Sequence, residues 1–199
     1  MLNMNSEESV KTTKKSSFAT EVFDWLEVIV SAILVVVVLF TFVFRVVTIV
    51  GDSMKETLHE GEKLIITNFF YTPKVGDIVV VSRNADNSPS SERSKGPIIK
   101  RVIATEGQWV DIDFEAGIVY VDGVALEEPY TRTPTNLSYD IEFPVLVPEG
   151  HIFCLGDNRN ESLDSRSSDI GNEGMIDTRY VLGHVAFRIF PFSKVGSVE

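Results

Sequence analysis

The sequence predicts a mainly β protein that follows a single N-terminal transmembrane helix. Two observations lead to this fold class. A run of 17 uncharged, almost entirely apolar residues extends from Val28 to Phe44. After it come short stretches typical of strands, separated by Gly, Pro and Asp residues typical of turns. The 199-residue chain is 44% hydrophobic, enough to bury a core, so we expect one domain of about 150 residues after the helix.

The N-terminal part is expected to be a tail and a membrane anchor. Residues 1–20 are rich in Ser, Thr, Lys, Glu and Asn, which predicts a disordered tail. Residues 21–45 predict the transmembrane helix, because the run is apolar on all sides, whereas a core helix of a soluble domain shows polar residues at helical period. No small-residue cleavage site of a secretory signal follows it. Basic residues flank both ends and barely favour an orientation. We expect a single pass through the cell membrane, with the short tail in the cytoplasm and residues 46–199 outside it.

Residues 46–199 predict a β-domain, expected to be the catalytic domain if the chain is an enzyme. The segment 83–96 holds four serines and Pro89 and predicts an exposed loop between two strands. The expected strands are Val46–Val50, Lys63–Thr67, Asp77–Ser82, Ile98–Ala104, Trp109–Phe114, Ile118–Asp122, His151–Leu155 and Val181–Phe190.

Charge and cysteine content exclude several classes of protein. The 29 acidic residues outnumber the 18 basic ones, and the net charge of −11 disfavours nucleic-acid phosphates as a partner. Cys154 is the only cysteine, so it cannot form an intrachain disulfide or a Cys-pair metal site. Its apolar neighbours predict a small core residue. The three histidines are scattered and lack the spacing of a zinc protease. We therefore expect no metal and no other cofactor.

Ser53 is the first candidate for chemistry. It follows an apolar extended run in the sequence Gly51-Asp52-Ser53. A glycine beside the serine allows a sharp bend that exposes the hydroxyl and turns backbone N–H groups toward a developing oxyanion. The same three residues also suit an ordinary turn, so the local sequence leaves both interpretations open.

Lys100 is the second candidate. Strand alternation places it on one face with Ile98, Val102 and Ala104. Burial among these side chains would lower the pKa of its amine, and a neutral amine can act as a general base for a serine hydroxyl without a histidine. The alternative is an edge-strand lysine whose amine reaches water. Arg101 faces the opposite way, where we expect an ion pair.

A third segment, from Gly156 to Arg166, is dense in hydrogen-bonding groups and follows an apolar strand. A solvated loop is the simple interpretation. The alternative is a network of charged residues that positions Ser162 beside another group. The charged residues available for such a network are Asp157, Arg159, Asp164 and Arg166.

In this order, behind an apolar helix, the three segments resemble the bacterial type I signal peptidases, membrane-bound Ser-Lys proteases that remove signal peptides. The resemblance extends from the helix to Ser193. The matching segments are Ser53-Met54 with Thr57-Leu58, Gly76–Val81, Lys100–Ala104 with Glu106-Gly107, Gly156–Arg166 and Gly183–Pro191.

The resemblance implies a role for each matching residue. Ser53 would be the nucleophile, with its backbone N–H in the oxyanion hole, and Lys100 would be the general base. Ser162 would hydrogen-bond the lysine amine and orient it. The supporting residues would be Asp157, Asp164, Arg166, Gly51, Met54 and Arg101. Two positions depart from the family pattern: Gly51 stands where some members have a serine that adds a second oxyanion donor, and Glu56 stands where proline is usual.

The implied fold is a largely antiparallel β-domain in which the substrate pairs as an extra strand. The substrate residues at the first and third positions before the cut would have small side chains, which would bind in shallow pockets. Ser53 lies eight residues after Arg45, so an extended chain keeps it within about 26–29 Å of the anchor's end. Signal peptides of preproteins, the lipid bilayer and the secretion machinery would be the partners. Two alternatives remain: a Ser-Lys protease with a narrow client or that cleaves itself, and a non-catalytic membrane-tethered β-module.

Overall fold

The computed structural model describes residues 18–82 and 96–198, and the chain divides into two compact units, residues 1–40 and 41–199. The first unit contains all but the last two residues of the helix α1 (Phe18–Phe42), which is long and apolar enough to cross a membrane by length and composition. The expected tail at 1–17 and almost all of the expected loop at 83–96 lie outside the described residues.

The boundaries of the expected anchor differ from the structure at both ends. The helix already begins at Phe18, within the segment expected to be tail, and it ends at Phe42. Strand β1 (Phe44–Thr48) follows, so Phe44 and Arg45 belong to the β unit rather than to the helix. Arg45 pairs with Ile66 of strand β2 (Lys63–Thr67). Hydrogen bonding to β2, rather than hydropathy, therefore decides where the helix stops.

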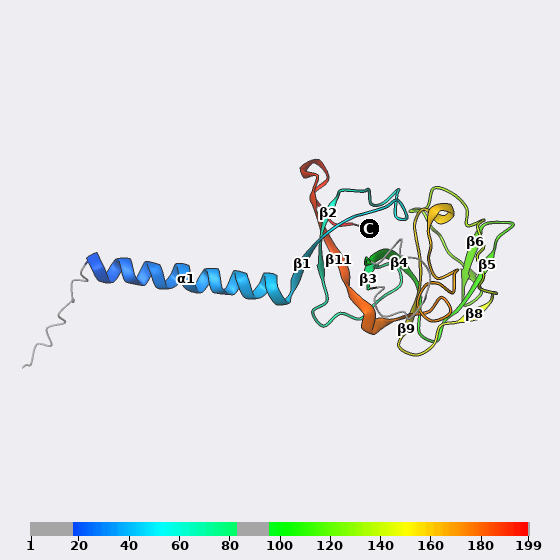
Figure 1. The fold of residues 1–199 in the computed structure, drawn as a ribbon, viewed down its shortest axis with the longest axis horizontal. Coiled ribbons are helices and arrows are strands. Elements are labelled where there is room, and N and C mark those ends of the chain that lie inside the picture. Colours follow the sequence, from blue (N-terminus) through cyan, green and yellow to red (C-terminus); the bar gives the residue numbers. More distant parts are fainter. Residues whose placement is uncertain (1–17, 83–95, 199) are drawn as a thin grey trace, which may run out of the picture. The chain divides into compact units, whose positions relative to one another are not determined.

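The β unit contains a seven-stranded sheet in which every neighbouring pair of strands is antiparallel. The predicted fold class is confirmed. In Figure 1, β1, β2 and β11 lie at one end of this unit and the strands of a second, smaller sheet lie at the other. The strand order is β1, β2, β11 (Val181–Phe190), β3 (Ile78–Val81), β4 (Ile98–Thr105), β9 (His151–Leu155) and β10 (Ile176–Asp177).

The smaller sheet has four strands, in the order β7 (Val124–Ala125), β6 (Ile118–Val121), β5 (Trp109–Asp113) and β8 (Val145–Leu146). All eight predicted strands are present, with ends within two residues of the expected positions. The sequence did not indicate β7, β8 and β10, because two residues are too few to show alternation.

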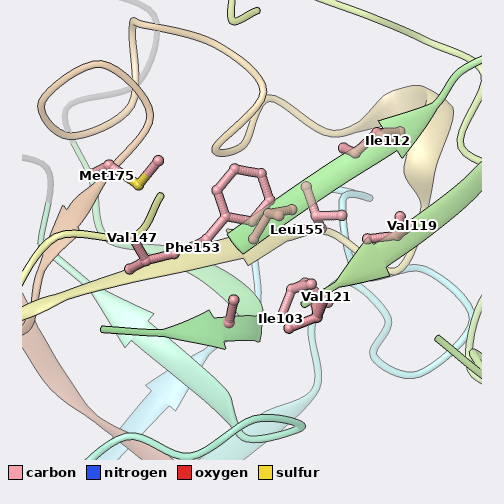
Figure 2. Packing of buried hydrophobic residues seen from close by; sticks show 10 residues of the cluster. Ile103, Ile112, Val119, Val121, Val147, Phe153, Leu155 and Met175 are labelled. Carbon is pink, nitrogen blue, oxygen red and sulfur yellow. The ribbon is translucent and has the colours of Figure 1, made fainter. Parts of the chain in front are cut away.

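A hydrophobic cluster joins the two sheets. Strand β5 alternates, with Val110 and Ile112 buried and Asp111 exposed. The buried side chains meet Phe153 and Leu155 of β9, as Figure 2 shows for Ile112, Phe153 and Leu155. The smaller sheet thus packs on strands β4 and β9 of the larger one.

A second cluster lies beneath the segment that carries Ser53. It contains Met54 and Leu58 from that segment and residues of β2, β3 and β11. Both side chains are fully buried. The turn that carries Ser53 is therefore held to the core by two buried side chains, those of Met54 and Leu58.

Candidate active site

Ser53 lies on a tight turn directly after β1. Gly51 has a φ of +90°, a conformation that glycine adopts without strain. The Lys55 N–H donates to the Asp52 carbonyl at 3.0 Å, and the Leu58 N–H donates to the Met54 carbonyl at 2.8 Å. Because Met54 is buried, the preceding serine is held at the surface of the core and remains half-exposed. The serine therefore does lie at a sharp bend.

Lys100 reaches Ser53 from the middle of β4. It pairs with Val79 of β3 and is only 2% exposed. Its Nζ lies 2.6 Å from Ser53 Oγ, a hydrogen bond between residues 47 positions apart in the sequence. Burial excludes the alternative of an edge-strand lysine whose amine reaches water. The two candidate residues are in direct contact.

Arg101 faces away from the dyad and forms the expected ion pair. Its Nε and Nη2 donate to the two carboxylate oxygens of Asp157 at 2.9 and 2.8 Å. Its Nη1 donates to the Gly76 carbonyl at 2.9 Å. Asp157 and Arg101 are both buried, so the bidentate pairing offsets the cost of removing two charges from water.

The segment from Gly156 to Arg166 holds the serine turn in place. Asp157 also accepts a hydrogen bond from the Thr57 hydroxyl at 2.5 Å. The Asn158 N–H donates to the Ser53 carbonyl at 3.0 Å, and its side-chain amide donates to the Asp52 carbonyl at 3.1 Å. Sequence reasoning assigned no role to Thr57 or Asn158 beyond their place in a motif, because contacts between segments 100 residues apart leave no local pattern.

Asp164 and Arg166 form the second buried ion pair of this segment. Arg166 donates from Nε and Nη2 to the Asp164 carboxylate at 2.8 and 2.9 Å. It also donates to the Arg159 carbonyl at 2.6 Å, and Asp164 accepts from the Gly156 N–H at 3.0 Å. The pair therefore stabilises the backbone of the segment.

The pairing of Arg159 differs from that of the expected network, because the carboxylate that it binds comes from outside the segment. It donates from Nη1 and Nη2 to the Glu128 carboxylate at 2.7 and 2.5 Å, and from Nη1 to the Thr135 hydroxyl at 2.7 Å. Glu128 follows β7 of the smaller sheet. Only the packing of the two sheets brings it to Arg159, so no sequence spacing could have indicated the pair.

Ser162 is fully buried near the dyad, but its hydroxyl has no hydrogen-bond partner among the described residues. The expected hydrogen bond to the Lys100 amine is therefore not formed in this structure. Gly156 separates Ser162 from the serine turn: a Cβ at that glycine would overlap Ser162 Oγ and lie 2.5 Å from the Ser53 carbonyl oxygen. The Ser162 side chain thus lies against Gly156 beside the serine turn, but its hydroxyl forms no hydrogen bond with the described residues.

Glu56, at the position where the resembling family usually has proline, has a φ of +127°. The proline ring fixes φ near −65°. The turn after Ser53 therefore has a backbone conformation that proline could not adopt. The Glu56 carboxylate lies 3.5 Å from the exposed guanidinium of Arg132, which connects the turn to the segment after β7.

A largely apolar cavity of about 390 Å³ opens beside Ser53. Its two walls are the end of β1 with the following residues, and the beginning of β4. The residues that line it are 47–51, Ser53, Met54, Val80 and 96–99. Gly51 contributes no side chain to the wall nearest the serine.

Cys154 lies beneath the site and is fully buried, as predicted. Burial raises the pKa of its thiol, the nearby Asp164 carboxylate raises it further, and the Lys100 amine lowers it. The thiol therefore stays protonated and unreactive. Among the described residues, no group of three His, Cys, Asp or Glu side chains could hold a metal ion.

The family description "signal peptidase, peptidase S26" matches residues 22–190, most of the sequence. The chain belongs to this signal peptidase family. The signal peptidase I of Bacillus licheniformis is 31% identical over 203 residues, covering 96% of this chain and 99% of the relative. The probable signal peptidase I-1 of Synechocystis is 36% identical over 156 residues, covering 74% and 72%. A crystal structure of a signal peptidase I from Enterococcus faecalis covers 57% of this chain and 97% of its own, at 26% identity and a TM-score of 0.43.

Membership of the signal peptidase family confirms the resemblance found in the sequence. The chain is a hydrolase of the serine endopeptidase class, and its family removes signal peptides. A non-catalytic module is accordingly excluded.

Proposed function

We propose that this signal peptidase cuts preproteins with a catalytic dyad of Ser53 and Lys100. The observation that carries the proposal is the 2.6 Å contact between Lys100 Nζ and Ser53 Oγ, made by a lysine that is 2% exposed. Burial disfavours the charged form of a lysine amine, and the proposal requires Lys100 to lose its proton below the ordinary lysine pKa of about 10.4. A neutral amine at hydrogen-bond distance is a competent general base.

The dyad accounts for both halves of the reaction. Lys100 takes the proton of the Ser53 hydroxyl while Ser53 Oγ attacks the scissile carbonyl carbon, and the backbone N–H of Ser53 stabilises the oxyanion. The Lys100 ammonium then protonates the leaving amine, the peptide bond breaks, and an ester remains on Ser53. Lys100 next takes a proton from water, whose oxygen attacks the ester carbonyl carbon. As the ester bond breaks, the Lys100 ammonium returns this proton to Ser53 Oγ, and the signal peptide leaves as an acid that ionises to the carboxylate.

The cavity beside Ser53 supports cleavage after small residues. Its two walls leave room for an extended segment running toward the serine, and their apolar lining suits small uncharged side chains. We propose that the substrate lies between these walls as an added strand. The side chains at the first and third positions before the cut would then point into the cavity.

We also propose that α1 anchors the enzyme in the cell membrane, with residues 1–17 in the cytoplasm and the β unit outside. The Phe44–Thr67 pair places the exposed Phe69 and Phe70 near the point where the chain enters the β unit. These rings are 62% and 92% exposed and would rest on the lipid bilayer. Ser53 lies only eight residues after Arg45 in the sequence, and such a short tether suits preproteins delivered by the secretion machinery.

The test compares cleavage of one preprotein by detergent-solubilised wild type and the variants Ser53→Ala, Lys100→Arg and Lys100→Met. We expect all three variants to be inactive. Arginine keeps the charge but cannot give up its proton in a protein, so Lys100→Arg should be as inactive as Lys100→Met. Methionine should pack among the neighbouring apolar side chains, leaving the thermal midpoint of Lys100→Met at or above that of wild type.

The pH dependence provides an independent check of the general base. The wild-type rate should rise with pH as Lys100 loses its proton, with an apparent pKa well below that of free lysine. If the Ser53→Ala variant kept activity within tenfold of wild type, the assignment of Ser53 as the nucleophile would be refuted. An active Lys100→Arg variant, or unfolding of Lys100→Met, would show that Lys100 is a structural cation instead.

A further inference from the structure

Tyr130 covers the guanidinium face of Arg101, the residue next to Lys100 in β4. The Arg101 Cζ lies 4.0 Å from the centroid of the tyrosine ring, within the range of a cation–π interaction. The edge of the same guanidinium is occupied by Asp157 and by the Gly76 carbonyl. The ring therefore adds to these hydrogen bonds without competing for a donor, and it shields one face of the Arg101–Asp157 pair from water.

Tyr130 is itself tied back to the catalytic segments. Its hydroxyl donates to Glu128 at 3.0 Å, and Glu128 forms the double contact with Arg159. Arg159 donates from Nε to the carbonyl of Gly156, the residue before Asp157. Burial raises the pKa of Tyr130, and the Glu128 carboxylate raises it further, so the hydroxyl stays a donor. These contacts form a closed loop of residues that runs from Asp157 through Arg101, Tyr130, Glu128, Arg159 and Gly156 back to Asp157.

The Arg101–Asp157 pair is part of this loop, and it links the segment that carries Lys100 to the segment that carries Ser53. Arg101 shares the β4 backbone with Lys100. Asp157 accepts a hydrogen bond from Thr57 in the serine turn, and the adjacent Asn158 N–H binds the Ser53 carbonyl. The ion pair therefore links the strand that carries Lys100 Nζ to the turn that carries Ser53 Oγ.

We propose that Tyr130 is a positioning residue for the Ser53–Lys100 dyad. Its ring holds the Arg101–Asp157 pair in a fixed, dry arrangement and so keeps the amine and the hydroxyl at reacting distance. Strand β7 of the smaller sheet leads into the segment that carries Tyr130, so this sheet would contribute to catalysis through Tyr130. This inference rests on the proposed dyad.

The experiment compares the full-length, detergent-solubilised variants Tyr130→Phe and Tyr130→Leu on one preprotein substrate, with kcat and KM measured separately. Tyr130→Leu removes the ring, and we expect kcat to fall by about 10-fold to 100-fold with KM within about twofold of wild type. Tyr130→Phe keeps the ring and loses only the bond to Glu128, so we expect it to retain kcat within about threefold. Tyr120→Leu, at a half-buried tyrosine of β6, is the matched control and should behave as wild type.

The outcomes separate this inference from the proposed function. Wild-type kcat in Tyr130→Leu, an effect on KM alone, or equal losses in the Phe and Leu variants would overturn the role of the ring, whereas Ser53→Ala would stay inactive. Activity in Ser53→Ala would instead overturn the dyad itself. Tyr130→Met supplies a second ring-free variant if Tyr130→Leu does not fold. Failure of both to fold would assign Tyr130 to the stability of the fold and overturn the inference.

Discussion

At the scale of single residues, the hydroxyls of Ser162 and Ser165 are a natural pair for comparison. Both serines are buried in the same segment. Ser165 Oγ accepts a hydrogen bond from the Cys154 N–H at 3.0 Å, whereas Ser162 Oγ has no partner among the described residues. A buried hydroxyl without a partner costs free energy of folding. A buried hydroxyl of this kind calls for an explanation, and a role in the reaction is one that can be tested.

We expect Ser162→Ala to separate stability from activity. Removing an unpaired buried hydroxyl should leave the free energy of unfolding unchanged within about 1 kcal/mol, or raise it. If the hydroxyl orients the Lys100 amine during the reaction, kcat/KM should fall by about 10-fold to 100-fold, the loss of one buried hydrogen bond worth about 1–3 kcal/mol. The position of the cut should not change. Denaturant unfolding and kinetics on one preprotein measure both quantities.

Ser165→Ala is the matched control for that prediction. It leaves the Cys154 N–H without its acceptor and should destabilise the fold by about 1–3 kcal/mol, while the rate per folded molecule stays near that of wild type. An unchanged rate in Ser162→Ala would show that this hydroxyl takes no part in the reaction.

At the scale of structural elements, the site depends on how closely the segment after β9 approaches the serine turn. The backbone of Gly156 lies between Ser162 Oγ and the Ser53 carbonyl, with no space for a Cβ. Hydrogen bonds from Asn158 to the carbonyls of Ser53 and Asp52 close the same contact. The glycine is needed for this close approach and not for its φ, which lies outside the left-handed region.

Gly156→Ala should therefore damage both the fold and the site. The added methyl group must displace either Ser162 or the backbone that carries Ser53. We expect a loss of about 1–3 kcal/mol in the free energy of unfolding, typical of overpacking, together with a loss of kcat/KM of at least about tenfold. Gly196→Ala is the control, because a Cβ there meets open space. A Gly156→Ala enzyme that matches wild type in both measurements would contradict this close packing.

At the scale of the whole molecule, the division into two units lies just before β1. Strand β1 belongs to the β unit, where it pairs with β2 along its full length. Val47 packs against the core beneath the serine turn, and Val47 and Thr48 line the cavity beside Ser53. The segment between α1 and Ser53 is thus part of the β unit rather than a simple linker.

Two truncations test this boundary. A chain of residues 43–199 retains β1, and we expect it to fold cooperatively and to leave the membrane fraction. A chain of residues 49–199 loses β1 and one wall of the cavity, so it should unfold at a lower temperature, by about 2–4 °C for each kcal/mol lost, and should not cut substrate. Circular dichroism melts and membrane fractionation measure these outcomes. A 43–199 chain that stays unfolded, or equal melts for both chains, would place the boundary elsewhere.

The sequence by itself determined the features that depend on local patterns. The uncharged run predicts a membrane-spanning helix, because no charged side chain interrupts it. Alternation and turn residues were sufficient for eight strands, since one buried face imposes a period of two. Lys100 was identified as a candidate because a lysine on an apolar strand face is unusual. Ser53, whose glycine bend also suits an ordinary turn, was identified through the order of the segments, which resembles that of the signal peptidase family.

Only the tertiary structure decided how these pieces meet. Pairing of β1 with β2 ended the helix at Phe42, and the packing of two sheets gave Arg159 its partner, Glu128. The left-handed backbone at Glu56 and the unpaired hydroxyl of Ser162 also have no local signature. Periodicity reports which face of an element is buried, but not which distant element covers it. That choice depends on the geometry of the whole fold, because each of these contacts joins segments that the sequence leaves far apart.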